Sequence, residues 1–191
     1  MRRNKYVHEG LFAHPETLVR QAYNSIEEFD ATCSKDGQAS ELAGTGMSYK
    51  WQAHSEGVYK ANWDAALNIQ NERIGLGSVI PDQEGNVKAA QCIVRRGRFE
   101  PGIAEALAAV QTLMLCRDLG LSKIQLEGDA TNVVKALNSI EVDWSKSGHI
   151  IEDARFMEQQ FLFCEIIYVG REGNNVAHNF AKQAARLGLE R

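Results

Sequence analysis

The order of strand-like and helix-like segments constrains the fold of this chain more than any other feature. Residues 58–64 alternate between polar and apolar side chains, the pattern of a strand. Two further strands are expected over 74–80 and 87–94, and turn residues at 81–86 join them. Three strands in succession predict an antiparallel meander that occupies one side of a sheet.

Helices and strands alternate after the meander. The expected elements are a helix over 103–119, a strand over 123–127, a helix from 128 to 137, a helix over 150–161, a strand over 164–169 and a closing helix over 175–187. Strands separated by helices pair in parallel, and the helices cover both faces of the sheet. The sequence therefore predicts an α/β fold, with a five-stranded mixed sheet of meander and parallel strands flanked by helices.

The first 50 residues differ from the rest of the chain in composition and residue pattern. Apolar residues recur at helical spacing over 15–29, which predicts an amphipathic helix. Residues 34–48 are rich in Ser, Gly and polar side chains, which is typical of a linker. We therefore expect a helix and flexible linker over 1–50 and one globular domain over 51–191.

Charge and hydrophobicity argue against several classes of protein. The net charge of −4 argues against tight, non-specific binding of nucleic acid, which needs clustered Lys and Arg. No apolar run is long enough to span a membrane, and no apolar segment follows the basic start as in a secretory signal. An intracellular protein of the nucleus or cytoplasm is expected, not a secreted one.

Three acidic residues stand out by their positions. Glu105 lies in an apolar helix, where a carboxylate is costly unless it is paired or bound to a metal. Asp129 follows a strand at the point where a helix begins, the edge at which α/β folds place their sites. Asp64 ends the first strand, which should be central in the sheet. Three carboxylates that converge would repel one another unless a divalent cation neutralised them.

Each of these acids also has an ordinary structural explanation. Asp129 could cap the helix that follows it, and Asp64 could bind a turn. Glu105 could form a salt bridge to Arg117 or Lys123. These alternatives stay open from the residues alone.

Two further motifs have competing interpretations. Arg95, Arg96 and Arg98 form the one basic cluster, which could bind backbone phosphates or lie in a solvated loop. Gly75 and Gly77 predict a bulge or a close approach of another backbone rather than a phosphate loop, because no helix follows them.

Four segments together resemble a known family. They are Lys60-Ala-Asn62-Trp-Asp64-Ala, Ala104-Glu105-Ala-Leu107, Glu127-Gly128-Asp129 and the run from Val169 to Ala181. In this order and spacing they resemble the plant RNase H-like domain, which occurs alone and at the C-terminal end of plant non-LTR retroelement polyproteins. The resemblance covers residues 51 to about 187.

The resemblance implies an RNase H fold that cleaves the RNA strand of RNA–DNA hybrids with two Mg²⁺ or Mn²⁺ ions. It implies that Asp64 bridges both ions, that Glu105 and Asp129 help to hold the first, and that Arg171 lies near the scissile phosphate. The candidate contacts to nucleic acid are therefore Asn62 and the cluster of Arg95, Arg96 and Arg98.

His178 departs from the family pattern, because relatives typically carry Asp at this position and use it to bind the second ion. Mg²⁺ prefers oxygen ligands, whereas imidazole suits softer ions such as Mn²⁺. His178 is therefore a candidate metal ligand or a residue that caps the site through hydrogen bonds, and weakened or Mn²⁺-biased cleavage is expected. The alternative is a catalytically impaired module on an RNase H fold that binds nucleic acid or a protein.

Overall fold

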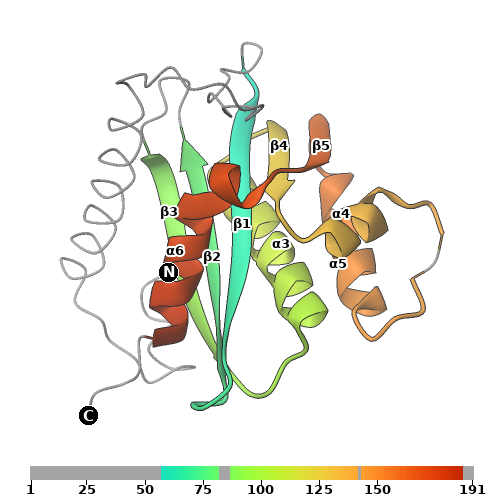
Figure 1. The fold of residues 1–191 in the computed structure, drawn as a ribbon. Coiled ribbons are helices and arrows are strands. Elements are labelled where there is room, and N and C mark those ends of the chain that lie inside the picture. Colours follow the sequence, from blue (N-terminus) through green and yellow to red (C-terminus); the bar gives the residue numbers. More distant parts are fainter. Residues whose placement is uncertain (1–56, 82–86, 142, 187–191) are drawn as a thin grey trace, which may run out of the picture. The chain divides into compact units, whose positions relative to one another are not determined.

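The computed structural model of the protein describes residues 57–81, 87–141 and 143–186. The helix and linker expected within residues 1–50 lie outside these ranges. The described elements are β1 (Tyr59–Asn68), β2 (Arg73–Pro81), β3 (Val87–Arg96), α3 (Pro101–Asp118), β4 (Lys123–Gly128), α4 (Thr131–Asn138), α5 (Gly148–Glu158), β5 (Phe163–Tyr168), η1 (Arg171–Asn174) and α6 (Asn175–Arg186) (Figure 1). Their order is the one that the sequence predicts.

The strands form one five-stranded sheet in the order β3-β2-β1-β4-β5. β1 pairs antiparallel with β2 and parallel with β4, and β4 pairs parallel with β5. The predicted mixed sheet with a central first strand is therefore confirmed.

One boundary of the sequence prediction was wrong. β1 does not end at Asp64 but continues to Asn68, so Asp64 lies inside a strand and does not bind a turn. Residues 65–67 are all apolar, which hides the alternation that marks a half-buried strand. They continue the ladder because β2 pairs with them, as in the pair Leu67 and Ile74.

Helices cover both faces of the sheet. α6 packs against β1, β2 and β3, while α3 packs on the opposite face together with α4 and α5 (Figure 1). α3 lies between the sheet and α5, which explains why its sequence is apolar almost all round. Within the described ranges, no helix has both the length and the apolar character needed to cross a bilayer.

Two glycines of β2 allow α6 to lie directly on the sheet. A Cβ atom on Gly75 would lie 2.1 Å from the carbonyl oxygen of Ala181, and one on Gly77 would lie 2.3 Å from that of Ala177. The predicted close approach of another backbone is therefore confirmed, and α6 is its source. Because His178 follows Ala177 directly, this packing also sets how deeply that side chain reaches.

We predict that Gly77→Ala lowers the free energy of unfolding by about 3 kcal/mol, because the added methyl group must displace helix backbone. Chemical denaturation measures the change. Gly102→Ala is the matched control, since a Cβ on Gly102 in the first turn of α3 meets nothing within 4 Å. Equal stability of both variants and the wild type would contradict the close packing of α6.

Candidate active site

The structure brings the three predicted acids together. One carboxylate oxygen from each of Asp64, Glu105 and Asp129 lies within 4.8 Å of the other two. The register explains the meeting of the two aspartates, because β1 and β4 are parallel neighbours with Trp63 opposite Gly128. Asp64 follows Trp63 within β1, Asp129 directly follows the last residue of β4, and α3 supplies Glu105.

The ordinary explanations for these acids do not hold in the described ranges. The N-cap of α4 is Ala130 rather than Asp129, and no side chain caps this helix. Glu105 forms no ion pair with described residues, and Arg117 pairs with its neighbour Asp118 at 3.6 Å instead. The acids are therefore grouped with one another rather than neutralised one by one.

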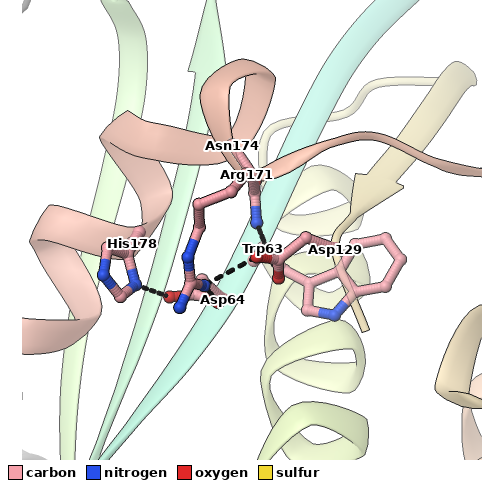
Figure 2. A network of polar contacts seen from close by, with 6 residues as sticks. All are labelled: Trp63, Asp64, Asp129, Arg171, Asn174 and His178. Atoms are coloured by element: carbon pink, nitrogen blue, oxygen red, sulfur yellow. Dashed lines mark hydrogen bonds and ion pairs between the residues drawn. The ribbon is translucent and has the colours of Figure 1, made fainter. Parts of the chain in front are cut away.

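Arg171 of η1 is the cation that faces this group. Its Nη1 donates to Asp129 Oδ2 at 2.6 Å and lies 3.4 Å from Asp64 Oδ1 (Figure 2). The Arg171 side chain keeps 58% of its surface exposed. It can therefore offset the carboxylates and still reach a group that arrives from solvent.

Asn174 is a site residue that the sequence interpretation missed. Its Nδ2 donates to the backbone carbonyl of Trp63 at 2.8 Å and lies 3.5 Å from Asp129 Oδ1 (Figure 2). Asn174 is buried, and it connects η1 to both strands that carry the aspartates. Its position in the 169–181 segment could have indicated a role in the site, but a neutral amide is less conspicuous in a sequence than a charged residue.

His178 contacts the site through Asp64. Its Nδ1 lies 2.6 Å from Asp64 Oδ2, a short hydrogen bond from α6 to β1 (Figure 2). His178 is not a member of the group of three candidate ligands. This contact matches the interpretation of a residue that caps the site through hydrogen bonds, and direct metal binding by His178 stays a prediction.

Burial and crowding shift the titration of the group. Burial, with the charge of Asp129 next in weight, raises the pKa of Asp64 to about 7, although Arg171 acts in the opposite direction. Burial and the charges of both aspartates raise the pKa of Glu105 to about 8. The pKa of His178 is lowered by burial and by the positive charge of Arg171. In the absence of a cation, Asp64 and Glu105 therefore retain protons near neutral pH.

The donor set fits a hard divalent cation. Glu105 Oε2 is buried and has no hydrogen-bond partner among the described residues, which is costly for a polar atom. The three grouped ligands are all carboxylates, the class that Mg²⁺ and Mn²⁺ prefer. A bound cation would satisfy the Glu105 oxygen and replace the protons that the group otherwise retains.

The predicted contacts to nucleic acid lie elsewhere. Arg95 and Arg96 are exposed at the end of the edge strand β3, which is two strands and roughly 10 Å from β1. Arg98 forms an ion pair with Glu72 at 2.8 Å. The structure does not bring these arginines to the carboxylates, and their binding of phosphates stays a prediction.

Asn62 occupies a buried position in the sheet. Only 6% of its surface is exposed, and its Nδ2 donates to Glu127 Oε2 at 2.9 Å. Its predicted contact with nucleic acid is not tested by this geometry, which instead gives the amide a partner inside the protein.

The sequence and the fold both match known proteins. The sequence profile of the family described as reverse transcriptase-like matches residues 62–184. No curated protein matches the chain.

Among the solved structures that share this fold are three RNase H proteins. RNase H1 from Halobacterium salinarum is 25% identical with a TM-score of 0.64, and the match covers 69% of this chain and 100% of that one. An N-terminal RNase H domain from Mycobacterium tuberculosis is 19% identical with a TM-score of 0.62, covering 69% and 95%. LC11-RNase H1, solved in complex with an RNA/DNA hybrid, is 16% identical with a TM-score of 0.60, covering 67% and 96%. The last two likenesses show the fold alone.

The plant and retroelement part of the resemblance stays a prediction. The family profile matches more than half of the sequence, and the sheet, the helices and the acidic group are those expected of the family. The chain therefore belongs to the reverse transcriptase-like family of RNase H-like domains.

Proposed function

We propose that the protein is a divalent-metal-dependent nuclease that cleaves the RNA strand of RNA–DNA hybrids. The observation that carries this proposal is the group formed by Asp64, Glu105 and Asp129, in which the buried Glu105 Oε2 has no hydrogen-bond partner within the part of the chain that the structure describes. The family membership and the hybrid-bound relative support the substrate class.

Each acid has a role in this proposal. Asp64 would bridge two cations, while Glu105 and Asp129 would hold the first of them. Cations bound there supply an activated water and stabilise charge on the leaving oxygen. The three carboxylates themselves would orient the site, and the raised pKa values of Asp64 and Glu105 mean that protons would leave as a cation enters.

Arg171 would bind the phosphate that is cut. Its guanidinium is always charged, forms paired hydrogen bonds with phosphate oxygens, and is exposed beside Asp129. Substrate binding then exchanges part of the Arg171–Asp129 contact for a phosphate contact.

His178 would hold Asp64 in one orientation rather than carry the fourth negative charge. The Nδ1 contact at 2.6 Å supports this role. A site that lacks one carboxylate attracts hard Mg²⁺ less strongly, so we infer that cleavage is slower in Mg²⁺ than in Mn²⁺.

The presence of His178 where the family typically has an acid favours a second candidate function. With His178 in place of an acid, the fold could bind RNA–DNA hybrid, other double-stranded nucleic acid or a protein without efficient cleavage. A cleavage assay run beside a binding titration separates the two candidates.

We predict that the wild type cleaves an RNA–DNA hybrid and that Asp64→Asn reduces cleavage to background while the protein stays folded. The amide removes the charge that both cations share. Cleavage is followed on a labelled hybrid in Mg²⁺ and in Mn²⁺.

Asp153→Asn is the control, because Asp153 is an exposed acid of α5 outside the site, and it should keep wild-type rates. Full activity of Asp64→Asn would overturn the proposed mechanism. Hybrid binding without cleavage in either ion would favour the second candidate.

We predict that Glu105→Gln stabilises the metal-free protein at high pH. A carboxyl whose pKa is raised in the folded state holds a proton that the unfolded state loses, so wild-type stability falls as pH rises from about 4.5 to about 8. The neutral amide avoids this loss, and we expect a gain of about 2 kcal/mol at pH 8 and almost none at pH 4.

Urea denaturation in a chelating buffer at both pH values measures the difference. Adding Mn²⁺ should then raise the stability of the wild type more than that of the variant. A variant that is less stable than the wild type at pH 8 would show that Glu105 has a structural role instead.

We predict that His178→Asp speeds cleavage in Mg²⁺ and removes the preference for Mn²⁺. The substitution restores a carboxylate at the position where the family typically has one. Rates in the two ions, measured at one pH, give the preference directly.

His149→Asp is the control, because it makes the same change at an exposed position of α5. If His178→Asp leaves both the rate and the ion preference at wild-type values, His178 does not influence the cation site.

A further inference from the structure

A buried polar network joins the two strands that carry the aspartates. Asn62 of β1 donates to Glu127 Oε2 of β4 at 2.9 Å, and Lys60 of β1 pairs with Glu127 Oε1 at 3.1 Å. The side chain of Glu127 is 5% exposed and that of Lys60 is 17% exposed. Burying a charge pair with an amide is costly, so its presence calls for an explanation beyond stability.

The network lies at a defined place in the register. Asn62 and Glu127 are opposite one another in the parallel ladder of β1 and β4. Asp64 follows Asn62 by two residues, and Asp129 follows Glu127 by two. Two residues is the repeat of a strand, so the network braces the strands one repeat before the acids.

The acids need such a brace. Asp64, Asp129 and Glu105 repel one another once ionised, and this repulsion acts to separate β1 from β4 at their shared end. Asn174 provides one link, because it joins the Trp63 carbonyl of β1 to Asp129. The network provides a second link between the same two chain segments.

We propose that Asn62, Glu127 and Lys60 are positioning residues that fix the spacing of Asp64 and Asp129 for cation binding, an inference that rests on the proposed function. They do not contact the cation or the substrate. They act through the two backbones by preventing the last rung of the ladder, between Trp63 and Gly128, from opening.

The same sheet offers a matched comparison. Gln125 of β4 donates to Glu165 Oε2 of β5 at 2.7 Å, and Gln125 is 7% exposed, against 6% for Asn62. Both are buried amides that bind a carboxylate on the neighbouring strand. Only the Asn62 bond joins the strands of the two aspartates.

The experiment compares Asn62→Leu with Gln125→Met, since each replacement roughly keeps the shape of the side chain and removes one donated bond. Two quantities are measured in the full chain: amide hydrogen exchange without metal, and Mn²⁺ affinity by calorimetry. For Asn62→Leu we expect exchange at Trp63 and Gly128 to be about tenfold faster. Mn²⁺ binding should weaken about tenfold, as for other outer partners of metal ligands.

Gln125→Met should cost less stability, because its partner Glu165 is exposed, and it should keep both values within about twofold of wild type, since it leaves the bond between Asn62 and Glu127 intact. Equal effects of the two variants, or none in Asn62→Leu, would overturn the proposal. If wild-type protein does not bind Mn²⁺, the proposed function fails, and the exchange rates alone decide whether the brace exists. An Asn62→Asp variant, which puts two carboxylates in contact, should accelerate exchange further at pH 8.

Discussion

Three carboxylates, each with an oxygen within 4.8 Å of the other two, repel one another once they are ionised, and the surrounding structure must hold them together. Burial strengthens that repulsion because little water screens it. The protein opposes it in two ways that the structure shows. Arg171 places a positive charge against both aspartates, and the raised pKa values of Asp64 and Glu105 keep protons on the group near neutral pH. A divalent cation would replace both means of compensation, so the cost in the empty state favours binding.

The sheet and helices around the site hold this unfavourable arrangement in place. The parallel pairing of β1 with β4 sets the two aspartates side by side, and Asn174 ties η1 to the same point. On β2, Gly77 has no side chain, which lets α6 approach closely enough for His178 to reach Asp64. The repulsion between the acids destabilises the folded state, and the packing of the strands and helices around them offsets this loss, as is common at functional sites.

Sequence reasoning reached the element order and the three acids because both rest on local patterns. Periodicity separates strands from helices, and an acid in an apolar helix, as Glu105 is, conflicts with its surroundings. The end of β1 was missed because its last residues do not alternate and belong to the strand through their pairing with β2, a contact between strands that periodicity does not encode. The partners of Asn174 and Asn62 lie 45 or more residues away, and nothing in a neutral amide predicts which distant group it will bind. These long-range polar contacts could therefore be identified only from the structure.

We infer that the acidic group binds a divalent cation by exchanging protons for it. Calorimetric titration of Mn²⁺ into metal-free protein, repeated in buffers of different ionisation enthalpy, measures the protons released on binding. With pKa values of about 7 for Asp64 and about 8 for Glu105, we expect the release of about one and a half protons at pH 7 and clearly fewer at pH 9. Binding heats that are identical in all buffers at pH 7, or no binding at all, would contradict it.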